Sequence, residues 1–147
     1  MPIQITGSIE GEQQLSRRLL VVADGVSDFG PPFERIKDKL LTTFDANFGA
    51  RGSFFGGWAP RKKDYPWPIL ENTGTMRKNF QGESHRDFLK ISNPTDYFKY
   101  HQSNQPRATA LPRRIMMKID NERKVFIQKE MQKYLVDIIR RSSSGRI

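Results

Sequence analysis

Apolar residues recur at helical spacing in the first third of the chain. Within residues 12–26 the intervals are four, three and four, which places one stripe on a single helical face: Leu15, Leu19, Val22 and Val26. Asp24-Gly25 and Gly30-Pro31-Pro32 are expected to break this helix. Pro32 suits the first turn of a second helix, which Gly49 is expected to end. Its stripe is longer and more aromatic: Phe33, Ile36, Leu40, Phe44 and Phe48.

The last long element is predicted as a helix over about residues 121–141, capped by Asp120. One stripe is expected to pack on a sheet, with Leu135 and Ile139 widening it: Ile127, Met131, Tyr134 and Ile138. The opposite face is charged and is expected to meet water or a partner: Lys124, Glu130, Lys133 and Asp137. Beyond it, residues 142–147 have the Ser-Gly composition of a flexible basic tail.

Between the helices the pattern favours short strands and turns. Residues 2–9 predict a strand, and residues 84–93 predict a strand or hairpin arm after a turn at Gln81-Gly82. Short helices are expected from Thr73 or Thr75 to Phe80, and again from Thr95-Asp96. The predicted fold class is α+β: a small antiparallel sheet flanked by N-terminal helices and a long C-terminal helix, within a single domain over residues 1–141.

Residues 54–80 form an irregular stretch that holds both tryptophans, Trp58 and Trp67. Gly56-Gly57 allows a turn before Trp58, and three prolines prevent a long helix or a central strand. Linkers are poor in large aromatic residues, so this stretch is interpreted as an ordered loop that plugs the core. Trp58 is expected to be mostly buried against the second helix, near Phe44 and Phe48.

Charge is distributed unevenly along the chain. Residues 1–50 hold seven acidic and five basic residues, a net of −2, and residues 51–147 hold nine acidic and twenty basic residues, a net of +11. Such an excess attracts polyanions or acidic protein surfaces. The clustered bases are Arg61, Lys62 and Lys63, then Arg113 and Arg114, then Arg140 and Arg141. Each cluster is interpreted first as a solvated face, then as a protein interface, and last as a nucleic-acid contact.

Signals for catalysis are poor. The two histidines, His85 and His101, are sixteen residues apart, and the chain has no cysteine, so no metal-binding spacing is present. Phosphate-binding glycine motifs are missing, and the proximity of Ser84, His85 and Asp87 along a strand does not make a triad. We therefore predict no catalytic, cofactor or metal residues. No signal peptide or membrane-spanning run is visible, and the lack of cysteine fits a reducing cytoplasm.

Four motifs occur in a distinctive order: G-x-W-x-P from Gly56, I-L-x-x-T-G-x-M from Ile69, Tyr97 followed by His101-Gln102, and L-P-x-R ending at Arg114. Together with the C-terminal helix, they resemble the phage Mu-type virion morphogenesis, or tail completion, family over roughly residues 10–141. The resemblance implies a structural, non-enzymatic role at the neck or tail end of a virion. The protein is then expected in the host cytoplasm during assembly and in the virion afterwards. Our first hypothesis is therefore a ring of identical subunits, closed by a head-to-tail contact, whose bases face acidic surfaces of neighbouring neck, connector or tail proteins. DNA is expected to pass nearby without specific binding.

Two groups of residues follow from this interpretation. The candidate interface residues are Arg61, Lys62, Lys63, Arg113, Arg114, Arg140, Arg141 and Arg146. The expected structural anchors are Trp58, Trp67, Gly74, Tyr97 and His101. Arg114 is expected to form a forked contact with a carboxylate or with backbone carbonyls. The alternative function is that of a basic nucleic-acid-binding protein, and a hydrolase that uses His101 or His85 is the least supported hypothesis.

Overall fold

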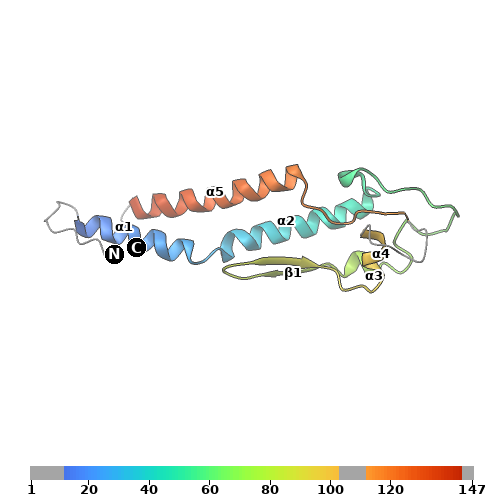
Figure 1. The fold of residues 1–147 in the computed structure, drawn as a ribbon, viewed down its shortest axis with the longest axis horizontal. Helices are drawn as coiled ribbons and strands as arrows, with labels where there is room; N and C mark the ends of the chain where they lie inside the picture. Colours follow the sequence, from blue (N-terminus) through green and yellow to red (C-terminus); the bar gives the residue numbers. More distant parts are fainter. Residues whose placement is uncertain (1–11, 103–111, 144–147) are drawn as a thin grey trace, which may run out of the picture.

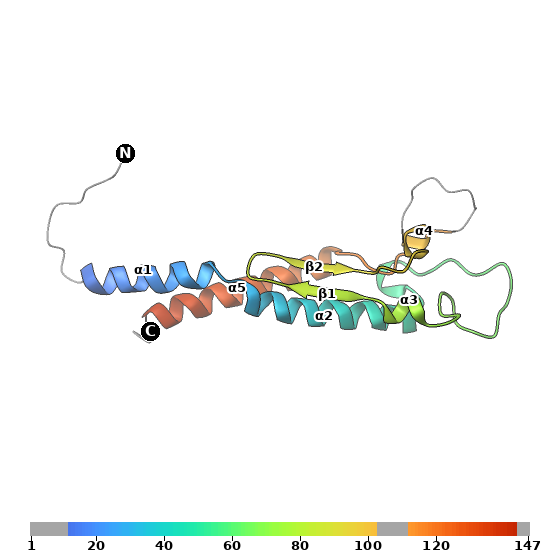
Figure 2. The ribbon, with the colours of Figure 1, turned by 90° about the horizontal axis from the view of Figure 1, so that it is seen from below.

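Helix α2 (Gly30–Gly49) is the central element of an elongated molecule, in which the computed structural model describes residues 12–102 and 112–143. Helix α5 (Asn121–Ser143) runs along one side of α2, and a β-hairpin lies along another side (Figures 1 and 2). Helix α1 (Glu12–Val26) extends beyond α2 and pairs with the C-terminal half of α5 (Figure 1). The α+β class predicted from the sequence is confirmed.

The apolar stripe of α2 forms the core, as its spacing predicts. Pro31 and Pro32 occupy its first turn, where no intrahelical N–H is needed. One buried cluster consists of Ile36, Leu40 and Phe44. A second cluster joins the end of α2 to the loops: Phe48, Met76, Phe98 and Met116. The helix ends at Gly49, as predicted.

The sheet is a two-stranded antiparallel hairpin, β1 (Gln81–Ser84) and β2 (Leu89–Ser92), with Gln81 opposite Ser92. The turn predicted at Gln81-Gly82 is wrong, because both residues belong to β1 and the chain reverses at residues 85–88. A Cβ on Gly82 would lie 2.6 Å from Cγ of Lys37 on α2. Glycine is therefore needed at this position so that the hairpin can approach α2 closely.

Three short helices complete the fold: η1 (Ser53–Phe55), α3 (Thr75–Lys78) and α4 (Phe98–Gln102). Helix α3 follows Gly74, which has a φ of 72°, and it ends before Phe80, where the sequence placed its end. Thr73 Oγ1 accepts a 3.3 Å hydrogen bond from the Thr75 N–H. The glycine supplies the left-handed turn that a threonine at the capping position would resist.

Helix α5 begins as predicted and runs two residues further than expected. Asp120 caps it, because its Oδ1 accepts the N–H of Arg123 at 3.0 Å. The stripe was expected to pack on the sheet, but α5 packs mainly on α1 and α2, since α2 separates much of it from the hairpin. Ser142, assigned to the flexible tail, is helical and buried.

Helix α1 spans the predicted residues, but its environment differs from the expectation. Gly25, expected to break the helix, lies within it, and a Cβ there would lie 2.6 Å from Cδ1 of Ile138. This glycine lets α1 and α5 approach closely. The strand predicted over residues 2–9 lies outside the described residues. In the described part of the chain, no helix has the length and apolar character needed to cross a membrane.

Candidate functional site

The irregular segments gather at one end of the molecule, which we call the loop end: η1, α3, α4 and residues 56–74 and 112–120 (Figure 1). The sequence folds this way because α2 stops at Gly49 and is followed by a series of residues with positive φ. Gly52, Gly56 and Gly57 have φ angles of 77°, 98° and 84°. These residues turn the chain back towards α2 and set the position of Trp58.

Trp58 anchors the loop to the end of α2. Its ring meets Phe48 edge-on at 5.1 Å, and its Nε1 donates a 2.8 Å hydrogen bond to the carbonyl of Ile115. The indole also covers Gly52, where a Cβ would lie 2.1 Å from its Cδ1. Trp58 is half-buried instead of mostly buried, and it packs with the Phe48 cluster, whereas Phe44 belongs to the neighbouring cluster. The anchoring role is as predicted, but the residue remains partly exposed.

Arg114 holds the same loop from the segment of residues 112–120. Its side chain is 6% exposed, and its Nε and Nη2 donate to the carbonyl of Ala59 at 3.0 and 2.9 Å. Nη2 also reaches the carbonyl of Pro60 at 3.4 Å. Burial, and secondly the charge of Arg61, lowers the pKa of the Arg114 guanidinium. The forked contact expected for Arg114 is formed within the subunit, on carbonyls.

Gln102 belongs to one of the motifs of the resemblance but was not among the expected anchors. Its side-chain Oε1 accepts the N–H groups of Met116 and Met117 at 2.7 and 3.2 Å, and its Nε2 donates to the Met117 carbonyl at 2.7 Å. The Arg114 N–H donates to the carbonyl of His101 at 2.7 Å. The amide thus substitutes for a strand partner, and it binds the His-Gln motif to the segment that follows L-P-x-R.

The tip of the loop is fixed by Arg61 and leaves two lysines outside. Arg61 donates to the carbonyl of Trp67 at 2.7 Å and to that of Tyr65 at 3.3 Å. The rings of Tyr65 and Trp67 stack at 4.9 Å. Lys62 and Lys63 are exposed beside this stack. Of the first basic cluster, Arg61 therefore serves the loop itself, and only the two lysines are directed to a partner or to water.

Three expected anchors share one pocket of about 360 Å³ at the loop end: Trp67, Tyr97 and His101 line it together with Met76. Gly74 lies at the start of α3 on the border of this region. Leu70, Asn72 and Thr73 complete the lining, so the walls mix aromatic, aliphatic, thioether and imidazole groups with uncharged polar ones. This composition suits packing or a docked side chain better than it suits a charged ligand.

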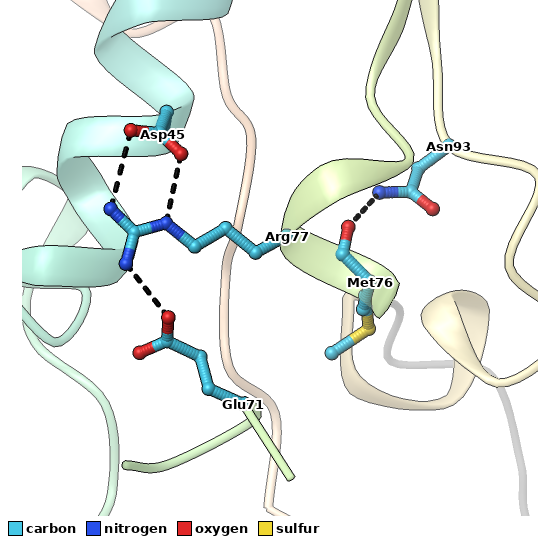
Figure 3. Close-up of polar contacts among 5 residues, drawn as sticks. All are labelled: Asp45, Glu71, Met76, Arg77 and Asn93. Carbon is cyan, nitrogen blue, oxygen red and sulfur yellow. Dashed lines mark hydrogen bonds and ion pairs between the residues drawn. The ribbon is translucent and has the colours of Figure 1, made fainter. Parts of the chain in front are cut away.

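Arg77 ties α3 to α2 by a contact that the sequence did not reveal (Figure 3). Its guanidinium donates to both carboxylate oxygens of Asp45, at 2.8 and 3.2 Å, and to Glu71 at 2.7 Å. The hydrogen bonds from Arg77 lower the pKa of Asp45 below its ordinary value. Asn93 Nδ2 donates to the carbonyl of Met76 at 2.7 Å, which joins α3 to the end of the hairpin. Arg77 and Asp45 are 32 positions apart in the sequence, so no local pattern could have indicated that they pair.

The remaining candidate interface bases lie at both ends of the molecule. Arg113 is exposed at the loop end, and its Nε donates to the Gln102 carbonyl at 3.0 Å. Arg140 and Arg141 are exposed in the last turn of α5, beside α1 at the opposite end of the molecule (Figure 1). Arg146 lies outside the described residues. The basic clusters therefore do not form one surface.

Within residues 12–102 and 112–143, no group of three or more histidine, aspartate or glutamate side chains is placed to hold a metal ion. Comparison with known protein families, with curated proteins and with solved structures found no match to this chain. The fold and the site define the class of this chain as an α+β protein with a loop-rich end, whose loops are held together by hydrogen bonds.

Proposed function

We propose that this chain is a structural protein of a phage virion that completes or joins the tail at the neck or tail terminus, as a ring of identical subunits. One observation carries the proposal. The motifs of the tail-completion resemblance are separate in sequence, yet they contact one another at the loop end. Arg114 binds the Ala59 carbonyl, and its N–H donates to the His101 carbonyl, so three of the motifs are joined directly. Met76 of the fourth motif belongs to a buried cluster against which Trp58 packs. A shared folded unit is a physical reason for those residue types to occur together in that order.

The surface of this unit fits a protein partner. Lys62 and Lys63 project from a loop that Arg61 and Arg114 hold in place, so little conformational entropy is lost when a partner binds. Positive charge on a preformed loop favours an acidic surface on a neighbouring neck, connector or tail protein. DNA passes nearby in this proposal without being gripped, because each neutralised phosphate would add affinity and hinder its passage.

The alternative function, nucleic-acid binding, is favoured by one observation. Tyr65 is half-exposed beside Lys62 and Lys63, and a base can stack on an aromatic ring next to such charges. The stack of Tyr65 on Trp67 already occupies one face of that ring. The protein partner therefore remains the first proposal.

The test is a complementation assay of virion assembly with a charge-reversed loop tip. The double variant Lys62→Glu, Lys63→Glu is expected to fold normally and to lower the yield of tailed, infectious particles at least about tenfold, since it presents like charge to an acidic partner. The matched control reverses two exposed lysines of α5, Lys124 and Lys129. An equal yield from both variants would refute the role of the tip, and absence of the chain from purified virions would refute the function itself.

The same variants separate the alternative function. A DNA-binding protein would bind bare DNA with a steep dependence on salt concentration. The loop-tip variant would abolish that binding, and the α5 control would keep it. Such binding by a chain that is absent from virions would favour the nucleic-acid function.

A further inference from the structure

The apolar stripe of α1 is a helix face that no described element of the chain covers. Leu15 and Leu19 are 54% and 60% exposed, and Val26 also remains exposed. With Val22, these residues alternate at intervals of four, three and four, the spacing of a heptad seam. Single exposed leucines are common on protein surfaces, but a contiguous apolar row marks an interaction site.

Helix α5 continues this face. Arg18 Nη2 of α1 donates a 3.1 Å hydrogen bond to Ser143 Oγ of α5. The row of side chains on α1 that includes Arg18 and the row on α5 that includes Ser143 therefore lie next to each other on one side of the helix pair. On α1, the row runs at steps of four from Arg18 through Val22 to Val26, and on α5 it runs through Leu135 and Ile139 to Ser143. Ile139 is 53% exposed. The open face therefore spans both helices.

We propose that this face is the contact with a second copy of the chain, formed by α1 against α1 of the partner about a two-fold axis. A heptad seam is complementary to another helix with the same spacing. Beside the seam, on its free flank, stand Ser16 and Ala23, which are small and uncharged and let a second helix approach closely. The seam of a second copy has the same heptad spacing and the same small flanking residues.

Charge favours the same partner. The arm, defined as residues 12–30 and 130–143, holds five basic and five acidic residues, whereas the whole chain carries a net charge of +9. Two copies that meet through their arms avoid the repulsion that would oppose contact between their basic regions. An acidic partner, by contrast, would gain little from a neutral surface.

The contact is independent of the proposed function. A two-fold contact pairs identical patches and does not close a ring, so a ring would need a second, head-to-tail contact. Loss of the arm contact would leave the role of the loop end open, and failure of the loop-end variants would leave the arm contact in place.

Leu20 provides a matched control for the test. It neighbours Leu19 and is 69% exposed, but it borders a cleft on the other side of the helix pair together with Arg17 and Asp24. The full-length chain is expected to sediment as an even multiple of its 17.1 kDa mass. Leu19→Glu is expected to halve the particle mass, and Leu20→Glu to leave it unchanged, with unaltered circular dichroism for both. A monomeric wild-type chain, or an equal effect of the two variants, would overturn the proposal.

A cross-linking measurement tests the symmetry of the contact. The chain contains no cysteine, so a single introduced thiol reacts only with its counterpart in another copy. Under mild oxidation Leu19→Cys is expected to give a covalent dimer, and Leu20→Cys to remain monomeric under denaturing conditions. The two-fold contact would be overturned if the chain formed a large assembly in which Leu19→Cys does not cross-link. It would also be overturned if the chain were a monomer in which another segment or protein shields Leu19.

Discussion

Replacing Gly52 by alanine tests whether Trp58 fixes the loop end. Gly52 has a φ of 77°, and a Cβ at this position would lie 2.1 Å from Cδ1 of Trp58. The variant must therefore both strain its backbone and displace the indole. Displacement separates the ring from Phe48 and breaks the hydrogen bond from Nε1 to the Ile115 carbonyl.

The expected loss can be worked from these contacts. A left-handed conformation costs an alanine about 1–2 kcal/mol. The indole hydrogen bond contributes about 1 kcal/mol, and the edge-to-face contact with Phe48 about 1 kcal/mol. Gly52→Ala should therefore lower the free energy of unfolding by about 3 kcal/mol. For a chain of this length that corresponds to a fall in Tm of about 10 °C.

Gly57 offers a control with the same strain and no steric conflict. Its φ is 84°, and no heavy atom lies within 4 Å of a Cβ built there. Gly57→Ala should therefore cost only about 1–2 kcal/mol. Urea unfolding followed by tryptophan fluorescence and circular dichroism measures both variants. Equal losses would refute the packing of Trp58 on Gly52, and an unchanged fluorescence of Gly52→Ala would do the same.

Two further predictions concern buried or paired charges. Arg114→Lys keeps the charge but loses the fork onto the Ala59 carbonyl, so urea unfolding should show a free energy of unfolding lower by about 1–2 kcal/mol. Arg140→Lys, at an exposed site, should lower it by less than about 0.5 kcal/mol. Equal losses would contradict the role of the fork. Asp45 has a lowered pKa through its hydrogen bonds with Arg77, so its contribution to stability is present above the ordinary pKa of 3.8 and is lost as the pH falls through the lower, folded-state value. Asp45→Asn should flatten this part of the curve of unfolding free energy against pH, and a curve parallel to that of the wild type would exclude the effect.

The sequence alone determined the elements whose signals are local. Helix α1 spans the predicted residues, α2 ends at the predicted Gly49, and α5 starts at Asn121 after the predicted cap, Asp120. Apolar spacing, proline at a first turn and a capping aspartate act within a few residues, so they can be interpreted without knowledge of the fold. The choice of Trp58 as a structural anchor rested on equally local features, the double glycine before it and the aromatic stripe upstream, whereas Arg114 was chosen from the L-P-x-R resemblance.

Only the tertiary structure decided the partners of these elements. Gly82 and Gly25 resemble turn residues in sequence, yet each allows a close approach, by the hairpin to α2 and by α1 to α5. The pairing of Arg77 with Asp45, and of Gln102 with Met116, joins residues that the chain keeps apart. Periodicity shows that a helix has an apolar face but not what covers it. The stripe of α1 was therefore predictable, and its exposure was not, because burial depends on where the whole chain places its other surfaces.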